Sequence, residues 1–459
     1  MNDSSNEPLG YNRRDFLKSG SFASLMTMMG GVELFAQSAP PAPTDDKTAL
    51  LKIKVGVIGL GARGREILEA FGKSKHAEVA AICDTYGPFL RRSAKFAPAA
   101  KQLQDYKAML EDKEVKAVVV ATPTHKHKEI VLAALRAGKH VYCEAPIANS
   151  IEDGREIALA AKAAKKQIFQ AGLQLRSDPQ RLFLHPFLRT GALGTWIMCR
   201  SQWHRKQSWR TTSPDAEQEK ALNWRLSRAT STGLVGELGI HEIDQAAWFL
   251  NAPPVSVTGF SSLLKWTDGR DVPDTAQAVF EFPHGVRLMW DATIANSFDA
   301  DYEIYYGSDA AVMMRENRAW MFKEVDSPLL SWEVYAKKER FFKEAGIVLM
   351  IGGSKQATME KAEAEVPFGT ATLTSALESF LLNSADLTAA AQQFIADYGE
   401  DDQEGLMTTL AKVREGQASQ RPAAGYLEGF RALVTAIKAN EVILSGSKVV
   451  FQPEWYELG

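Results

Sequence analysis

The sequence predicts an α/β protein that begins with a doubly wound parallel sheet and continues into a second domain of different construction. The first observation is length, because 459 residues favour two domains over one. The second is that short apolar segments alternate with helical patterns over residues 51–172, as in parallel βαβ units. The third is that longer alternating strands replace this rhythm over residues 173–459. We therefore expect a domain boundary near residue 172.

Composition and charge narrow the class of protein. The chain has 53 basic and 56 acidic side chains and a formal net charge of −3, whereas a nucleic-acid-binding domain needs a clear basic surplus or stripe. Hydrophobic residues make up 45% and charged residues 24%, which is typical of a soluble globular protein. The cysteines Cys83, Cys143 and Cys199 form no CxxC or Cys/His pattern, so neither a disulfide scaffold nor a metal site is expected.

Residues 1–36 have the features of an export signal. An Arg-Arg pair at positions 13 and 14 precedes a Phe-Leu pair and a weakly apolar run of residues 19–36. A positive start, an apolar stretch and a small-residue end are typical of signal peptides, and the paired arginines indicate the twin-arginine route, which carries folded cargo. A lone amphipathic helix with a chance arginine pair, or an uncleaved anchor, are the alternatives. Residues 37–50 are expected to form a Pro/Ala/Asp-rich linker.

Export by this route sets several expectations. We expect the mature protein to be periplasmic or extracytoplasmic, to have no stable membrane span, and to have the twin-arginine machinery as a transient partner. Because the cargo folds before export, any cofactor would be acquired in the cytoplasm.

A glycine-rich turn follows the first predicted strand, residues 53–58, and opens a helix. It contains Gly59, Gly61, Ala62, Arg63 and Gly64 in the G-x-G-x-x-G pattern. In this context Gly59 permits a tight turn, Gly61 lets the backbone approach a pyrophosphate, and Gly64 lets the helix pack closely on the strand. The segment therefore predicts a Rossmann-type dinucleotide site, whereas the glycines alone would also fit a chance turn.

An acidic residue ends the second predicted strand. Asp84 lies twenty positions after Gly64, where a carboxylate accepts hydrogen bonds from the adenosine ribose and repels a 2′-phosphate. NAD is therefore the expected cofactor, although the nearby Arg91 and Arg92 leave NADP open.

Polar and turn residues follow the next two predicted strands, 117–121 and 140–143. In a doubly wound sheet, ligands lie at the carboxyl ends of the strands, so we expect these residues to contact the cofactor. Any one of them alone would also fit an ordinary turn. They are Thr122, Pro123, His125, Glu144 and Pro146.

The second domain is predicted from strands and one long helix. A turn at residues 283–285 indicates a β-hairpin, and a helix is expected over residues 426–440. The expected strands are 195–203, 255–264, 275–282, 286–292, 302–306 and 311–316.

Glu237 and His241 form the strongest chemical pattern of the second domain. On an α-helix these residues share one face. A carboxylate bonded to one imidazole nitrogen fixes the tautomer and raises the basicity of the other nitrogen. The pair therefore predicts a catalytic dyad that removes a hydroxyl proton, with a satisfied surface histidine as the alternative.

Taken together, these motifs resemble the Gfo/Idh/MocA family of nicotinamide-dependent oxidoreductases. The resemblance rests on GLGARG, AICD, ATPTHKH, HVYCEAP and GELGIHEID, and covers about residue 51 to the C-terminus. It implies a C-terminal α+β domain with an open, mostly antiparallel sheet, a carbohydrate substrate and a homo-oligomer. It also implies that His241 lies near the nicotinamide.

Five further residues are expected in the pocket, because aromatic faces suit sugar rings and arginine suits hydroxyl or carboxylate groups. Trp224 and Arg225 are assigned to the cofactor, and Gln174, Arg176 and His204 to the substrate. For His204 a surface role is an equal alternative.

One position departs from the family pattern. Family oxidoreductases usually have lysine as an acid/base group where this chain has Ala145, and some NAD-dependent glycosidases of the superfamily have an apolar residue there. Three functions remain: an exported sugar oxidoreductase with tightly bound NAD(H), a redox-neutral NAD-dependent glycosidase, and an inactive nucleotide-binding module. Export separates the protein from the cytoplasmic NAD pool, which favours the first two.

Overall fold

The computed structural model describes residues 52–330, 333–341, 344–348, 368–415 and 421–459. The predicted signal peptide and linker lie outside the described residues. The chain divides into two compact units. Of the described residues, those within 52–178, 201–301 and 368–459 belong to the larger unit, and those within 179–200 and 302–348 belong to the smaller unit.

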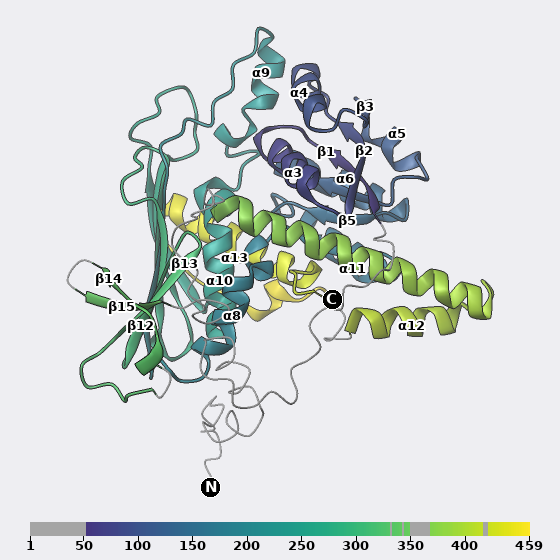
Figure 1. The fold of residues 1–459 in the computed structure, drawn as a ribbon. Coiled ribbons are helices and arrows are strands. Elements are labelled where there is room, and N and C mark those ends of the chain that lie inside the picture. Colours follow the sequence, from purple (N-terminus) through teal and green to yellow (C-terminus); the bar gives the residue numbers. More distant parts are fainter. Residues whose placement is uncertain (1–51, 331–332, 342–343, 349–367, 416–420) are drawn as a thin grey trace, which may run out of the picture. The chain divides into compact units, whose positions relative to one another are not determined.

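The larger unit begins with the predicted doubly wound sheet. Its six strands are in the order β3-β2-β1-β4-β5-β6, and all neighbouring pairs are parallel (Figure 1). The central strands are almost wholly buried and apolar, as expected for a sheet covered on both faces. The strands are β1 (Ile53–Ile58), β2 (Ala77–Cys83), β3 (Lys101–Leu103), β4 (Ala117–Val120), β5 (His140–Cys143) and β6 (Phe169–Ala171).

Helices from both ends of the sequence cover this sheet. The connecting helices are α3 (Ala62–Lys73), α4 (Gly87–Ser93), α5 (Tyr106–Glu111), α6 (His127–Arg136) and α7 (Ile151–Ala163). The C-terminal helices are α11 (Phe368–Tyr398), α12 (Gln403–Glu415) and α13 (Tyr426–Ser445). Phe380 and Leu377 of α11 share one buried cluster with Ile67 of α3, whereas Leu433 of α13 joins Ile157 of α7 in another.

The larger unit also contains a second sheet of order β7-β10-β9-β8-β16. The pairs with known register are antiparallel, and the predicted hairpin at 283–285 joins β9 to β10. Helix α10 (Ile240–Leu250) follows in this unit. The strands are β7 (Trp196–His204), β8 (Ser256–Ser262), β9 (Thr275–Glu281), β10 (Arg287–Thr293) and β16 (Lys448–Val450).

The smaller unit contains helix α8 (Pro179–Leu188), the first part of β7, and strands in the order β14-β15-β13-β12-β11-β7. Inside this unit, Arg181 and Glu303 form a buried ion pair at 3.1 Å, with side chains 2% and 7% exposed. The two strands predicted here are confirmed as β11 and β12, whereas β13, β14 and β15 were not predicted. The strands are β11 (Asp301–Gly307), β12 (Ala310–Arg315), β13 (Arg318–Lys323), β14 (Lys338–Phe341) and β15 (Glu344–Val348).

The structure therefore confirms the predicted fold class, a Rossmann-type parallel sheet followed by a mostly antiparallel sheet. Among the described residues, no helix combines the length and apolar character that crossing a bilayer requires.

Buried histidines, among them His127 and His140, make the fold sensitive to acid. Burial lowers the pKa of both His127 and His140 to about 4. The Nδ1 atom of His140 accepts the N–H of Ile168 at 2.9 Å, and its Nε2 atom lies 3.0 Å from the Thr388 hydroxyl. Protonation of the His140 Nδ1 atom would leave the N–H of Ile168 without an acceptor.

We expect the free energy of unfolding to fall as the pH drops from about 6.5 to 4. In that range the unfolded histidines bind protons and the folded ones do not, so each contributes a loss of about 1.4 kcal/mol per pH unit. Urea unfolding at several pH values measures this slope. His140→Asn should make the slope shallower, and an unchanged slope would contradict the assignment.

Candidate active site

The turn between β1 and α3 is built on three glycines with different roles. Gly59 has φ +93°, and a Cβ there would lie 2.6 Å from the backbone of Ala121. A Cβ on Gly64 would lie 1.9 Å from the carbonyl oxygen of Gly59. A Cβ on Gly61, in contrast, would meet no atom within 4 Å. Gly59 and Gly64 are therefore needed for packing. Gly61 leaves backbone accessible to a ligand, as the Rossmann pattern requires.

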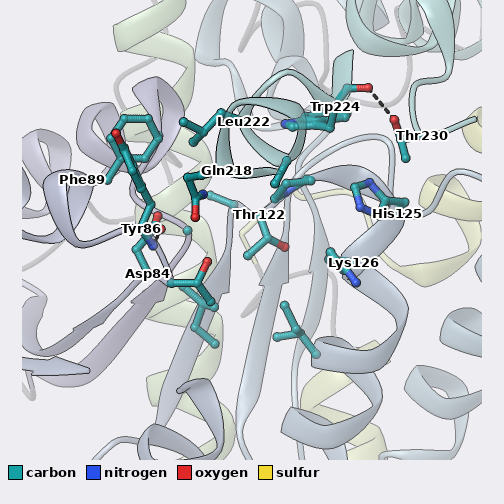
Figure 2. Close-up of a pocket in the computed structure, with 18 of the residues that line it drawn as sticks. Asp84, Tyr86, Phe89, Thr122, His125, Lys126, Gln218, Leu222, Trp224 and Thr230 are labelled. Carbon is teal, nitrogen blue, oxygen red and sulfur yellow. Dashed lines mark hydrogen bonds between the residues drawn. The ribbon is translucent and has the colours of Figure 1, made fainter. Parts of the chain in front are cut away.

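A cavity of about 850 Å³ opens over this turn within the larger unit (Figure 2). Its volume is in the range of small-molecule and cofactor sites. Most of the residues predicted to bind the cofactor line it. They are Gly59, Gly61, Ala62, Arg63, Asp84, Thr122, Pro123, His125, Trp224 and Arg225. Gly64, Glu144 and Pro146 are not among the lining residues. Gly64 instead packs against the backbone of Gly59.

Asp84 lies at the end of β2, with the aromatic residues Tyr86 and Phe89 beside it. Its carboxylate accepts backbone N–H groups of Leu60 and Tyr86, each at 2.7 Å. Burial raises the pKa of Asp84, and these hydrogen bonds oppose the rise. The rings of Tyr86 and Phe89 meet edge to face, with centroids 5.0 Å apart. The aromatic pair was not predicted, because one aromatic residue before a short helix and one in its first turn form no distinctive pattern.

The loops after β4 and β5 are joined by a residue that the sequence motifs did not single out. The buried ring of His127 lies between the carbonyl oxygens of Thr122 and Pro146, at 2.9 and 3.0 Å. His125, which was predicted, lines the cavity (Figure 2), and its Nδ1 atom is buried without a partner. Burial, with the charge of Lys126, lowers the pKa of His125, so the ring is neutral at neutral pH.

A short helix forms a further wall of the cavity. Helix α9 (Ala216–Leu222) contributes Gln218 and Leu222, and Figure 2 shows them above Asp84 and Tyr86. This wall was also not predicted, because the polar segment that forms α9 has no apolar periodicity.

Arg63 connects the cavity to residues predicted at the strand ends. Its Nε atom donates to Glu144 at 3.0 Å and its NH2 group donates to Gln174 at 2.7 Å. Burial raises the pKa of Glu144, and the charge of Arg63 opposes that rise. Glu144 and Gln174 therefore hold the Arg63 side chain, which lines the cavity.

Glu237 does not form the predicted hydrogen bond with His241. Residues Val235–Gly239 form a π-helical turn, so the four-residue spacing does not follow ordinary α-helical geometry. One carboxylate oxygen of Glu237 accepts the hydroxyl and the N–H of Thr232, and the other accepts Nε of Arg225 at 3.3 Å. The prediction that Glu237 orients His241 directly was therefore wrong, and Glu237 instead holds Arg225 at the cavity.

His241 keeps the features of a base without that partner. Its Nδ1 atom is buried and has no hydrogen-bond partner. Burial, together with the nearby charge of Arg63, lowers its pKa to about 4. The imidazole is therefore neutral at neutral pH and can accept a proton.

Two predicted substrate residues are engaged with carboxylates. Arg176 forms two hydrogen bonds with Asp244, at 2.7 and 2.9 Å, and lies over the ring of Trp248. His204 lies 2.6 Å from Asp291 through Nε2. Neither Arg176 nor His204 is among the residues lining the cavity, so their contact with a substrate stays a prediction.

Within the described ranges, no group of three or more His, Cys, Asp or Glu side chains is arranged to hold a metal ion. Cys83, Cys143 and Cys199 are all buried and free.

Fold and site together define a class: a two-domain α/β protein with an NAD-binding Rossmann domain. The model of an oxidoreductase family with an NAD-binding Rossmann fold matches residues 53–172, and the model of the GFO/IDH/MocA C-terminal domain matches residues 184–312. Together they cover more than half of the chain, which therefore belongs to the Gfo/Idh/MocA family.

Similar proteins include inositol dehydrogenases. Inositol 2-dehydrogenase 2 of Saccharopolyspora erythraea is 30% identical over 237 residues, which are 51% of this chain and 65% of that protein. Inositol 2-dehydrogenase of Salmonella typhimurium is 28% identical over 203 residues, 44% of this chain and 55% of that protein. The matches thus span less than two thirds of these relatives.

Solved structures share the fold. Levoglucosan dehydrogenase in complex with NADH and levoglucosan has a TM-score of 0.63 at 16% identity, covering 87% of this chain and 99% of that one. Aldose-aldose oxidoreductase from Caulobacter crescentus has a TM-score of 0.60 at 18% identity, covering 87% and 100%.

The contrast between two glycines gives a direct test of the cofactor site. Gly61→Ala should leave the unfolding temperature unchanged but weaken NADH binding at least tenfold, because its Cβ would occupy only ligand space. Gly64→Ala should destabilise the fold by about 1–3 kcal/mol, because its Cβ would overlap backbone. Thermal unfolding and NADH fluorescence titration measure both. Equal effects of the two substitutions on stability would contradict these roles.

Proposed function

We propose that the chain is an exported oxidoreductase that oxidises a hydroxyl group of a sugar or polyol and keeps its NAD(H) bound between reactions. The glycine turn and Asp84 support NAD as cofactor. The names of the relatives, inositol dehydrogenases, and of a fold neighbour, levoglucosan dehydrogenase, support a polyhydroxylated substrate.

The neutral, unpartnered imidazole of His241 is the observation that carries this proposal. Oxidation of an alcohol removes a proton from oxygen and a hydride from carbon. When bound, NAD supplies the hydride acceptor. His241 is neutral and its buried Nδ1 atom has no partner, as a proton acceptor requires. His241 is not among the residues that line the cavity, so its contact with the substrate hydroxyl is part of the proposal. Arg63 lines the cavity, and its charge also lowers the pKa of His241. His241 is therefore close enough to the cofactor site to feel the charge of one of its residues.

Removing this base should abolish most of the activity. We expect His241→Ala to lower kcat/KM by about 10²–10⁴-fold while unfolding temperature and NADH affinity stay unchanged. The matched control is His284→Asn, which replaces an exposed histidine in the β9–β10 turn by a residue that tolerates its positive φ. Activity retained in His241→Ala would assign the proton transfer to another group.

The pH dependence should identify the same residue. Because the pKa of His241 is lowered to about 4, the base stays deprotonated well below its ordinary range. We expect the His241-dependent acid limb of kcat/KM to lie near pH 4, measured over short times so that unfolding does not contribute. A limb near pH 6.5 would show that an exposed histidine, and not His241, is the base.

Export and assembly form part of the proposal. The twin-arginine pattern in residues 1–36 supports a periplasmic location reached through the twin-arginine machinery. Outside the cytoplasm a retained cofactor must be regenerated by a second substrate or within one catalytic cycle. A homo-oligomer is supported by Phe260, Met289 and Val450, which are exposed by 62%, 39% and 58% and share one face of the second sheet.

Ala145 supports a second candidate, a redox-neutral glycosidase. Ala145 cannot supply the proton-transferring amine that family oxidoreductases place there. In the glycosidase reaction a sugar hydroxyl is oxidised, and the proton on the adjacent carbon is removed. The glycosidic C–O bond then breaks by elimination, and the aglycone takes a proton. Water adds to the double bond, and the returned hydride restores the alcohol.

One experiment separates these functions. The purified protein is incubated with free sugars, polyols and aryl glycosides while nicotinamide absorbance and released aglycone are recorded together. Stoichiometric cofactor reduction that a second sugar reverses supports the oxidoreductase. Aglycone release without net reduction supports the glycosidase. Cofactor binding with neither outcome favours an inactive binding module, and a protein that binds no NAD(H) contradicts both enzymes.

A further inference from the structure

The wall of the cavity that faces the Rossmann sheet comes from residues 217–230. Its first part belongs to residues 205–223, a segment that we call the strap. The strap contains α9, none of whose seven residues is buried. Five of these residues line the cavity. A helix usually persists in a fold by burying one face. The face of α9 that would be covered therefore points at the cavity, and a bound molecule would cover it.

The strap is fastened on one side only. Its first residues pair with the second sheet, where the N–H groups of Arg205 and Gln207 donate to carbonyl oxygens of Thr293 and Ile294 at 3.0 and 3.1 Å. Within the described part of the chain, no hydrogen bond or ion pair joins the strap to residues 52–172. The strap thus reaches the Rossmann sheet only across the cavity.

A small set of contacts keeps the strap folded over the cavity. Arg210 donates to Glu219 at 2.7 Å and to the carbonyl oxygen of Asp268 at 3.0 Å. Thr211 and Asn223 form two reciprocal hydrogen bonds of 2.8 Å, which close the base of the strap. The Arg210–Glu219 pair is partly exposed, at 37% and 24%, and solvent screening makes such pairs weak. The closure is therefore weak enough to open.

The side chains that α9 presents match an adenosine group. Figure 2 shows Leu222 on the side of Tyr86 and Phe89, and Gln218 above Asp84. Apolar and aromatic groups suit the faces of a purine ring. A glutamine amide has both donors and an acceptor, which the edge of adenine can pair with. Asp84 lies where the adenosine ribose binds in Rossmann domains, so this end of the cavity is the adenosine end.

We propose that the strap is a latch on the adenosine end of NAD(H), in which Gln218 and Leu222 complete the binding site and the Arg210–Glu219 pair holds it closed. This inference rests on the proposed function, because only a retained cofactor needs a latch. Opening of the strap then sets the rate of cofactor release.

Two variants and one control test the latch. The double substitution Gln218→Ala/Leu222→Ala removes the contacts, and Glu219→Gln weakens the fastening without changing the cavity wall. Glu114→Ala removes an exposed ion pair with Lys54 elsewhere on the Rossmann sheet and serves as the control. Stopped-flow displacement of NADH by excess NAD⁺ gives the release rate. Titrations with ADP-ribose and with nicotinamide mononucleotide report the two ends of the cofactor separately.

We expect the double variant to release NADH at least tenfold faster and to bind ADP-ribose about tenfold more weakly, with nicotinamide mononucleotide unaffected. Glu219→Gln should speed release about threefold, and Glu114→Ala should match the wild type. Release rates equal to the wild type in both strap variants, or equal weakening of both half-cofactors, would overturn the latch. If the double variant does not fold, Glu219→Gln alone decides.

The outcome also separates the latch from the proposed function. A wild-type chain that binds neither NADH nor ADP-ribose refutes both. A chain that binds NADH and releases it independently of the strap refutes the latch alone. A chain with strap-dependent release but no activity on any sugar, polyol or glycoside supports the latch and refutes the enzyme.

Discussion

The close approach of α3 to the ends of β1 and β4 is the constraint on which the site depends. Gly59 lies against the backbone of Ala121, and Gly64 lies against Gly59 itself. Neither contact leaves room for a side chain. Because the N-terminus of α3 is held this near to the sheet, Arg63 reaches Glu144 at the end of β5. The same glycines that shape a phosphate-sized opening thus also place the guanidinium that relates the cavity to His241.

Two arginines that line the cavity are paired with carboxylates. Arg63 is bonded to Glu144, and Arg225 is bonded to Glu237, whose side chain is only 2% exposed. A partly buried charge destabilises the fold little when it is paired. Removal of one partner leaves the other charge buried and unpaired, which lowers the free energy of unfolding. The pairs therefore keep the electrostatic surroundings of the cavity fixed, and against this background burial holds His241 in its uncharged form.

The sequence was sufficient where structure follows from local rules. The glycine turn, Asp84 and the residues after β4 were predictable because strand, turn and helix lie within a short stretch of chain. The sequence wrongly predicted a Glu237–His241 hydrogen bond, because one extra residue in the π-helical turn alters the relation between neighbouring turns, and the sequence shows no sign of that residue. Helix α9 was missed because it lacks an apolar stripe, and β16 was missed because its partner β8 is distant in the sequence. Strands β13, β14 and β15 were also missed, although β13 pairs with the neighbouring β12 and β14 pairs with β15.

His127 joins the loop of Thr122 to the turn of Pro146 with a single ring. A neutral imidazole has one N–H and one acceptor nitrogen, so at any moment it can donate to only one of the two carbonyl oxygens. In one tautomer the ring donates to the carbonyl oxygen of Thr122, and in the other it donates to that of Pro146. The second carbonyl oxygen then faces the unprotonated ring nitrogen. The two arrangements differ in their surroundings, because the Cys143 thiol also lies 3.5 Å from Nδ1. A ligand that contacts the Thr122 loop would favour one of them, so cofactor binding and the protonation pattern of this ring are coupled.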